Sequence, residues 1–226
     1  MAAKTVTTSV PIIFWESVSD PVEQGLVTSL ARPGKNVTGF TTVGWILAGK
    51  RLEVLKEVIP KLAHIAVLWD PKAPGNPPQW KESRKEAQQL DLRLHSMEVS
   101  SPTKYDSAFK DAINAGSTAL AVTRHRLSIE YQKRITELAA RNRLPAIYPR
   151  GDFVENGGLM SYGADEVELY SRAACMVDKI LKGAKPSDVP VETSKKFDLV
   201  INLKTAKQIG LTIPPNVLAR ADRVIK

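Results

Sequence analysis

The residue types that carry out chemistry are sparse in this chain of 226 residues. Its three histidines, His64, His95 and His125, are far apart, and none pairs with another at metal-ligand spacing. The sequence has no Gly-x-Ser-x-Gly motif to present a nucleophile, and no glycine-rich loop followed by Lys and Ser or Thr to hold phosphates. We therefore predict neither catalysis, nor a bound metal, nor a cofactor.

Cys175 is the only cysteine, which excludes an intramolecular disulfide and a cysteine zinc cluster. It lies in an apolar, helically periodic stretch, 170–181, so we expect it to be buried. The charge of +8 comes from Lys and Arg that alternate with acids, as in Lys81-Glu82, and aromatic residues are not interleaved with them. This pattern is typical of solvated helix faces and predicts no nucleic-acid partner. No apolar run approaches the roughly 18 residues that would span a bilayer.

Short apolar runs alternate with amphipathic stretches of about ten to fifteen residues along most of the chain. Such alternation predicts right-handed βαβ crossovers and an α/β fold with parallel sheets. The expected strands are 10–15, 36–41, 64–69, 92–99, 119–122, 145–148 and 197–202, and the expected helices are 22–32, 47–58, 80–90, 105–115, 129–142, 165–182 and 204–209. The rhythm breaks at 151–163, which predicts a segment that crosses between two lobes.

Polar and aromatic residues follow several of the expected strands, at the carboxyl ends where open α/β sheets bind their ligands. These strand ends are 15–20, 69–71, 123–124 and 148–150. These residues are suited to bind a small solute, but two structural roles are open alternatives. Asp20 and Asp70 each precede a proline, as helix-capping residues often do, and the tryptophans suit a hydrophobic core.

Several local strings, taken in order, resemble the ABC-transporter substrate-binding proteins of the periplasmic-binding-protein-like type I fold, a group that includes tryptophan- and tyrosine-associated members. The strings cover nearly the whole chain, and they are 19–22, 29–34, 36–39, 49–53, 66–71, 144–148, 157–163, 182–186, 202–207 and 210–215. They include Gly49-Lys50-Arg51-Leu52-Glu53 and Ala66-Val67-Leu68-Trp69-Asp70-Pro71.

The resemblance implies two Rossmann-like lobes that close on a ligand in the cleft between them. We expect 1–42 and 159–226 to form an incomplete first lobe and 43–158 the second, with 36–42 as one crossing and 159–163 as the return. Family members have a signal peptide and further βα units before the strand that matches 12–15, whereas 1–9 has no hydrophobic signal core. We therefore expect a short first lobe with an exposed sheet edge, which favours pairing with a second copy as a homodimer.

The function implied is that of a solute receptor for an ABC importer, not an enzyme, which is periplasmic or lipid-anchored and docks on a membrane permease. Carried over by position, the expected ligand-binding residues are Trp15, Ser17, Asp20, Asp70, Thr123 and Tyr162. An aspartate would meet an ammonium group, Ser17 or Thr123 a carboxylate, and an aromatic side chain the apolar part of an amino acid or aromatic acid. Arg124-His125-Arg126 departs from the family pattern, which favours a ligand that differs from the usual one or that carries negative charge.

Two alternatives remain. A sensor or regulator domain of the same fold would need a helix-turn-helix segment, and none precedes residue 10. A small α/β enzyme would need a nucleophile, a base or a metal cluster, which the sequence does not display.

Overall fold

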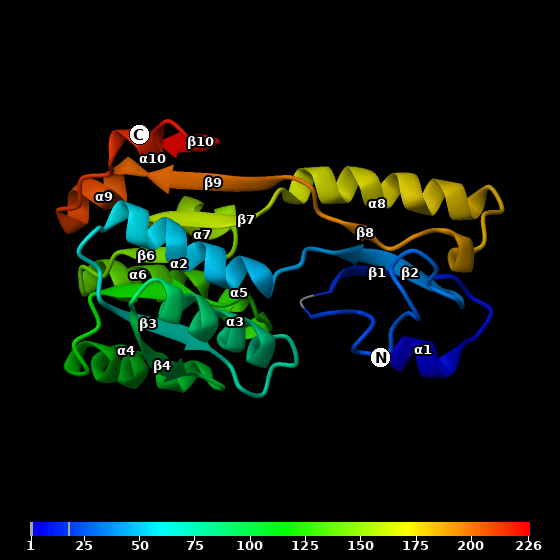
Figure 1. Ribbon diagram of the computed structural model, residues 1–226, viewed down its shortest axis with the longest axis horizontal. Helices are drawn as coiled ribbons and strands as arrows, with labels where there is room; N and C mark the ends of the chain where they lie inside the picture. The colour runs from blue at the N-terminus through cyan, green and yellow to red at the C-terminus, as the bar shows by residue number, and fades with distance from the viewer. Residues whose placement is uncertain (1, 18) are drawn as a thin grey trace. The chain divides into compact units, whose positions relative to one another are not determined.

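The computed structural model describes residues 2–17 and 19–226, and the chain divides into two compact units. The first unit comprises Met1–Gly44 and Ala164–Phe197, and the second comprises Trp45–Gly163 and Asp198–Lys226. Each unit has its own sheet, as Figure 1 shows, with strand order β1-β2-β8 in the first and β10-β9-β7-β6-β5-β3-β4 in the second. The chain therefore passes between the units three times, after Gly44, Gly163 and Phe197.

The sheet of the second unit is built on β3, which lies between β4 and β5 and is parallel to both. Parallel pairing continues from β5 to β6 and from β6 to β7, and β10 runs parallel to β9. The α/β class with parallel-dominated sheets is thus confirmed. The strands are β3 (His64–Trp69), β4 (Arg93–Glu98), β5 (Ala119–Val122), β6 (Ala146–Tyr148), β7 (Met160–Ala164), β9 (Phe197–Asn202) and β10 (Arg223–Ile225).

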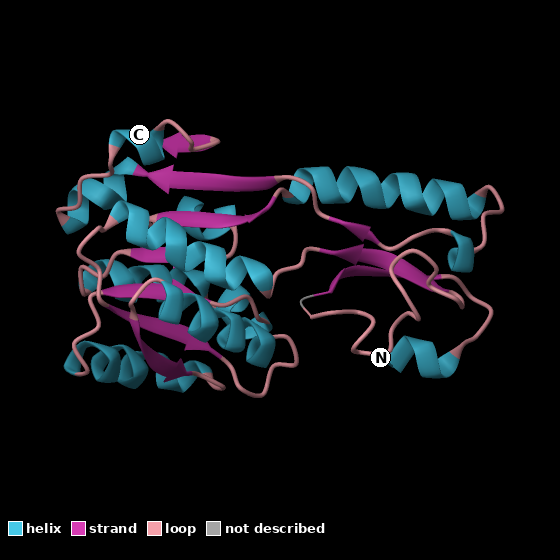
Figure 2. Cartoon of the chain, in the orientation of Figure 1, coloured by secondary structure: helices cyan, strands magenta, loops and turns pink. Residues whose placement is uncertain are grey.

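Helices cover both faces of this sheet, because alternate residues of a strand point to opposite sides. Ile65 and Val67 of β3 belong to a core shared with α2 (Ile46–Val58), α3 (Asn76–Gln89), α9 (Leu203–Ile209) and α10 (Pro215–Leu218). Ala66 and Leu68 belong to a second core with α4 (Tyr105–Asn114), α6 (Gln132–Arg141) and α7 (Gly151–Glu155). Figure 2 shows helices around the strands of this sheet. The unit also contains the short α5 (Arg126–Glu130) and the 3-10 turn η1 (Pro102–Lys104).

The first unit has a three-stranded sheet in which β2 (Val37–Thr41) lies between β1 (Ile12–Ser17) and β8 (Glu192–Thr193), parallel to both. The long helix α8 (Glu166–Leu181) packs on one face, where Leu169 and Met176 contact a core around Phe40. Val27 and Leu30, from the loop that precedes β2, cover the other face. The unit also contains α1 (Ala2–Val6) and the 3-10 turn η2 (Pro186–Asp188).

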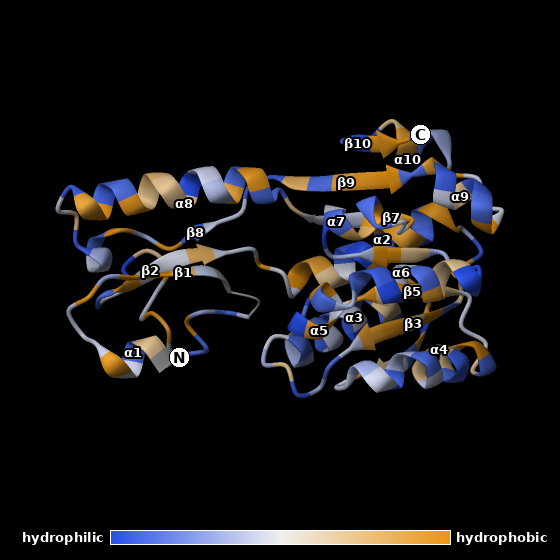
Figure 3. Ribbon diagram, turned by 180° about the vertical axis from the view of Figure 1, so that it is seen from behind, coloured by the Kyte–Doolittle hydropathy of each residue, from blue (hydrophilic) through white to orange (hydrophobic). Residues whose placement is uncertain are grey.

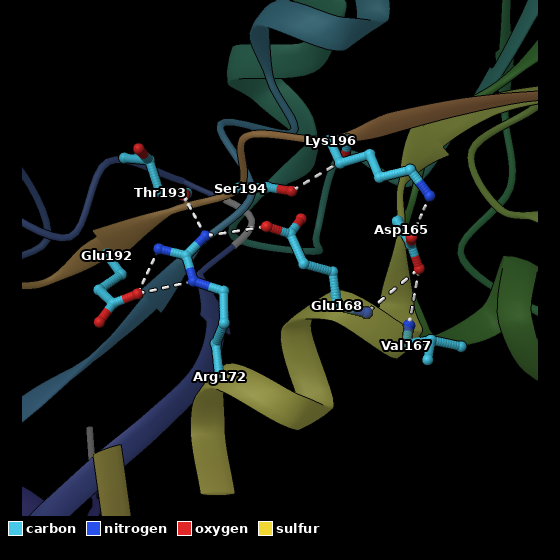
Figure 4. Close-up of polar contacts among 8 residues, drawn as sticks. All are labelled: Asp165, Val167, Glu168, Arg172, Glu192, Thr193, Ser194 and Lys196. Atoms are coloured by element: carbon cyan, nitrogen blue, oxygen red, sulfur yellow. Dashed lines mark hydrogen bonds and ion pairs between the residues drawn. The ribbon is translucent and has the colours of Figure 1, made fainter. Parts of the chain in front are cut away.

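Polar contacts fix the N-terminal half of α8 to this sheet (Figure 4). Asp165 caps the helix by accepting hydrogen bonds from the N–H groups of Val167 and Glu168, at 2.9 and 3.2 Å. Arg172 donates to the carboxylate of Glu192 through Nε, at 2.8 Å, and through Nη2, and its Nη1 donates to the carbonyl of Thr193 at 3.2 Å. The guanidinium thus joins α8 to β8.

A second apolar stripe of α8 does not face the core. Its members are largely exposed: Val167 at 78%, Tyr170 at 62%, Val177 at 41% and Leu181 at 81%. At about 100° per residue, this stripe lies roughly a third of a turn from the one formed by Leu169 and Met176. Figure 3 shows apolar and polar residues interspersed along α8. Cys175 also lies on α8 and is exposed, so the expectation that it is buried is wrong: the apolar periodicity of 170–181 belongs partly to this outer stripe.

The helix expected over 22–32 is absent, and 21–26 forms successive turns. The carboxylate of Asp20 accepts from the N–H of Val22, and Gly25 then takes a left-handed conformation with φ of 65°, so no continuous helix develops. The long helix expected over 129–142 is divided at Tyr131 into α5 and α6. In contrast, α3 begins at Asn76 rather than residue 80, because Pro77 and Pro78 suit a first helical turn.

The crossing segment expected over 151–163 contains α7 and most of β7, and β7 pairs with β6 inside the second unit. The C-terminal part of the chain also differs from the expected boundaries, which gave 159–226 to the first lobe. β9 and β10 extend the seven-stranded sheet beyond β7, so 198–226 belongs to the second unit. Among the residues that the structure describes, none of the helices is long and apolar enough to cross a membrane.

Candidate functional site

The carboxyl ends of β3 and β5 lie at the same edge of the large sheet, because the two strands are parallel neighbours with Leu68 opposite Val122. The residues that follow each strand, Asp70 and Thr123, are therefore brought to this edge. Both are buried, at 8 and 2% exposed. Buried polar groups need hydrogen-bond partners, and Asn76 of α3 supplies one to the backbone of Asp70 and one to the hydroxyl of Thr123.

Asn76, at the start of α3, joins the two strand ends. Its Oδ1 accepts from the backbone N–H of Asp70 and from the hydroxyl of Thr123, each at 2.8 Å. Its Nδ2 donates to the carbonyl of Arg124 at 2.9 Å. The side chain is almost fully buried, and these three bonds fix the backbone after β3 to the backbone after β5.

Gln79, one turn further along α3, holds the same loop by its backbone. Its Nε2 donates to the carbonyls of Gly75 and Arg124, at 2.9 and 3.0 Å, and its Oε1 accepts from the N–H of Arg124 at 3.0 Å. Asn76 and Gln79 together therefore determine the main-chain position of Arg124. Such a connected network of buried amides makes this edge rigid.

Arg51 of α2 reaches the same network and is 3% exposed. Its Nη2 donates to Oε1 of Gln79 at 3.5 Å, and its Nη1 donates to the carbonyl of Tyr162 at 3.4 Å. Both contacts are long for hydrogen bonds to a guanidinium. Burial, with a smaller effect of the like charge on Arg124, lowers the pKa of Arg51 to about 9.

Asp70 and His125 also contact residues of this network. Oδ1 of Asp70 accepts from the N–H of Lys72 at 3.0 Å and from the hydroxyl of Ser100. The ring of His125 is buried with Nδ1 3.3 Å from the carbonyl of Thr123, and its Nε2 has no hydrogen-bond partner among the described residues. Burial lowers the pKa of His125, which favours the neutral imidazole.

Three of the residues predicted from the sequence thus meet in one unit. Asp70 and Thr123 share Asn76, and Tyr162 joins the network through its carbonyl and Arg51. The hydroxyl of Thr123 directs its single proton to the carbonyl of Leu68, at 2.9 Å, or to Asn76. As arranged here, this hydroxyl has no proton left to donate to a carboxylate.

The other three predicted residues belong to the first unit. Trp15, 37% exposed, stacks on Tyr170 of α8 with ring centroids 4.4 Å apart. Ser17 ends β1, where its backbone is paired with Thr41. Asp20 accepts hydrogen bonds from the N–H groups of Val22 and Glu23, so it caps a turn. Their binding roles stay predictions.

Sequence reasoning missed Arg51, Asn76 and Gln79 as members of the site. For Arg51 a signal was present, because Leu47, Arg51 and Leu55 are each four residues apart and share the buried face of α2. A charged residue that shares such a face with apolar residues is expected to be buried. A buried charge of this kind is a candidate for a site. Among the described residues, no group of three or more His, Cys, Asp and Glu side chains is arranged to hold a metal ion.

Comparison with known proteins gives a consistent result. The family model described as ABC transporter substrate binding protein matches residues 1–225. A Tyrosine-binding protein of Clostridioides difficile is 28% identical over 210 residues, which are 93% of this chain and 60% of that protein. The chain thus spans less than two thirds of the length of this relative.

Two solved structures have the same fold over nearly the whole chain. A conserved domain protein from Vibrio cholerae is 28% identical with a TM-score of 0.89, and the match covers 99% of this chain and 74% of that one. An ABC domain of Streptococcus pneumoniae, in complex with L-Trp, is 28% identical with a TM-score of 0.87, covering 98 and 76%. A glucose-galactose binding protein from Geobacillus stearothermophilus, at 15% identity and a TM-score of 0.52, shares the fold alone.

Proposed function

Because this chain belongs to the family of ABC transporter substrate-binding proteins, we propose that it is a receptor for a small amphipathic solute, with an aromatic amino acid as the leading candidate. The family, the Tyrosine-binding protein and the ABC domain in complex with L-Trp are described as binding solutes rather than as enzymes. The names of two relatives, at 28% identity, specify tyrosine and L-Trp. We extend that ligand class to this chain.

The observation that carries the proposal is the hydrogen-bonded edge formed by Asp70, Asn76, Thr123 and Arg51 in the second unit. It combines a carboxylate, fixed amides and a guanidinium at the carboxyl ends of parallel strands, where α/β sheets bind small ligands. Asp70 has one oxygen, Oδ1, engaged by the protein, and its other oxygen is suited to an ammonium group.

The test is direct binding of L-Trp, L-Tyr, glucose and benzoate, measured by calorimetry and by thermal unfolding. A ligand at a hundred times its dissociation constant stabilises the folded state by about 2.7 kcal/mol, so an authentic ligand raises the melting temperature. We expect L-Trp or L-Tyr to do so. A response to the sugar alone would contradict the amino-acid assignment. The expected closure of two lobes on the ligand stays a prediction, and a ligand-dependent fall in the radius of gyration by small-angle X-ray scattering tests it.

The transport partner we propose is an ABC permease, on which the ligand-bound receptor docks. The support is the family description, and the family is extracytoplasmic in general. Location in the periplasm or on a lipid anchor is part of the same proposal. Reconstitution of the receptor with a permease from the same genome, and measurement of ligand-stimulated ATP hydrolysis, is the test.

We also propose that the outer stripe of α8 pairs with α8 of a second copy. Val167, Tyr170, Ala174, Val177 and Leu181 repeat at alternating steps of three and four, the spacing of a coiled-coil seam. The N-terminal part of the helix carries Glu166 and Glu168, and the C-terminal part carries Lys179 and Lys182. An antiparallel pair places the acidic half of each helix against the basic half of the other.

Sedimentation velocity tests the pairing. We expect the chain to sediment as a dimer, and we expect the double variant Val177→Glu, Leu181→Glu to sediment as a monomer. Ile46→Glu, at an exposed apolar position of the second unit, is the control and should remain dimeric. A monomeric parent chain at micromolar concentration would contradict this proposal.

A further inference from the structure

Arg51 is a buried cation that no carboxylate of the described residues neutralises. It is 3% exposed, and its hydrogen-bond partners are two neutral oxygens, Oε1 of Gln79 and the carbonyl of Tyr162. The charged group that acts on it most strongly is another cation, Arg124. A guanidinium removed from water without an anion is costly, so such groups in proteins are almost always paired.

The hydrogen-bonding capacity of Arg51 is also only partly used. A guanidinium has five N–H donors, and the two contacts here engage one each of Nη1 and Nη2, at 3.4 and 3.5 Å. Nε forms no hydrogen bond with a described residue. The donor edge of Arg51, formed by Nε and the second N–H group of each terminal nitrogen, therefore has no partner among the described residues.

The surroundings of Arg51 place this donor edge where a ligand is expected. Gln79 and the backbone of Arg124 lie at the carboxyl ends of the parallel strands, and Tyr162 is the residue before Gly163, where the chain leaves the second unit. Gln79 is itself held by three further bonds and cannot turn its own donors toward a ligand. Arg51 is thus the member of the network that has a positive charge and unfilled N–H donors for a ligand.

We propose that Arg51 binds the carboxylate of the ligand through its unfilled N–H donors, with Gln79 and the carbonyl of Tyr162 holding the guanidinium in place. This inference rests on the proposed function, and it identifies the group that recognises the acid end of an amino acid. It replaces Thr123 in that role, because the hydroxyl of Thr123 already donates its proton within the protein. Two positive charges, Arg51 and Arg124, favour an anionic group at this edge.

The experiment uses formate as a probe of the anion site and two amino-acid derivatives as probes of the ligand. Thermal unfolding is followed in formate and in chloride at equal ionic strength, for the parent chain, Arg51→Met and Arg51→Lys. L-Trp and L-tryptophanamide are then compared by calorimetry. The amide keeps the ammonium group and the indole but lacks the carboxylate. Arg220→Met, which removes an exposed guanidinium paired with Glu57, is the matched control.

We expect formate to raise the melting temperature of the parent chain and of Arg220→Met, but not of Arg51→Met, with a smaller response in Arg51→Lys. The parent chain should bind L-Trp about 10- to 100-fold more tightly than the amide, the range for a hydrogen bond to a charged group. Arg51→Met should bind both compounds with the weak affinity of the amide. Circular dichroism verifies that each variant is folded.

The outcomes separate the two proposals. A formate response that is absent, or equal in Arg51→Met and the parent chain, overturns the role of Arg51 whether or not amino acids bind. Equal losses of L-Trp and amide affinity in Arg51→Met would show that Arg51 only positions Tyr162. If formate responds as expected but no amino acid binds, the anion site stands and the proposed ligand class is wrong.

Discussion

The two units of this chain differ in how completely their sheets are covered. In the second unit, helices pack on both faces of seven strands, and Tyr105, Phe109 and Phe153 are fully buried. In the first, one long helix packs on three strands and leaves most of a second apolar stripe exposed. Apolar burial is the main stabilising term in folding, so the second unit should contribute most of the stability. The first unit depends more on individual polar contacts.

Truncation of one apolar side chain in each unit tests this difference most directly. Phe109→Ala should lower the free energy of unfolding by about 3–5 kcal/mol, because it leaves a cavity in a closed core. Leu181→Ala, on the outer stripe of α8, should change it by less than about 0.5 kcal/mol in a monomeric preparation. Urea unfolding followed by circular dichroism measures both. Equal costs would mean that α8 is covered as fully as α4.

Within the first unit, Arg172 is the contact that we expect to matter most. Arg172→Met removes the bonds to Glu192 and Thr193 that join α8 to β8, and leaves a half-buried carboxylate without its partner. The expected loss is about 1–3 kcal/mol. Faster amide exchange along α8 should accompany it. Lys182→Met, which breaks an exposed pair with Asp178, should cost no more than about 0.5 kcal/mol, and a similar loss in both variants would argue against a special role for Arg172.

The burial of the Arg51 charge in the second unit should make the free energy of unfolding depend on pH. Its pKa is about 9 in the folded chain, against 12.5 ordinarily. Between these values the unfolded chain binds more protons at this position than the folded one, so the free energy of unfolding rises with pH. The penalty of the buried charge is fully present below pH 9.

Relative to Arg51→Met, the parent chain should therefore gain about 1.6 kcal/mol of stability on going from pH 9 to pH 10.5. Urea titrations at the two pH values give the difference in the free energy of unfolding between the two proteins. Other groups titrate equally in both proteins, so their contributions cancel. An unchanged difference would show that Arg51 is solvated in the folded chain.

The smallest effect that we expect comes from the cap of α8. Asp165→Ala removes the acceptor for the N–H groups of Val167 and Glu168 and should cost about 1 kcal/mol. Asp165→Asn keeps the cap and should cost less. The hydrogen bond from Lys196 is the main cause of a lowered pKa of Asp165, so the charge-dependent stability is present at neutral pH and is lost as the pH falls through that lowered pKa. If the stability lost on acidification were as large in Asp165→Asn as in the parent chain, this assignment would be wrong.

The sequence predicts the elements of the second unit best. The strands at 119–122 and 197–202 were expected with the bounds that the structure has, because both are apolar runs limited by polar or turn residues. The strands β8 and β10 are too short for any periodicity to reveal them. The helix expected over 22–32 fails because local bonds to Asp20 and a left-handed Gly25 favour turns over a repeating helix.

The sequence predicts those residues of the candidate site that directly follow parallel strands. Asp70 and Thr123 directly follow parallel strands, so the topology brings them to one edge. Arg51, Asn76 and Gln79 reach the same edge through helix packing, which a single sequence does not specify. Likewise, the sequence of α8 shows apolar periodicity but not which of its two stripes faces the sheet, and this is why Cys175 was expected on the wrong side.

The exposure of Cys175 has a practical consequence for studying the first unit. The chain has one thiol, so a maleimide dye or a nitroxide reacts at a single place without any engineered residue or removal of native cysteines. The labelled position lies beside Ala174 on α8, next to the outer stripe. Its emission anisotropy or spin mobility would respond directly when another surface covers that helix. Cys175 thus serves as a built-in reporter for the outer stripe of α8.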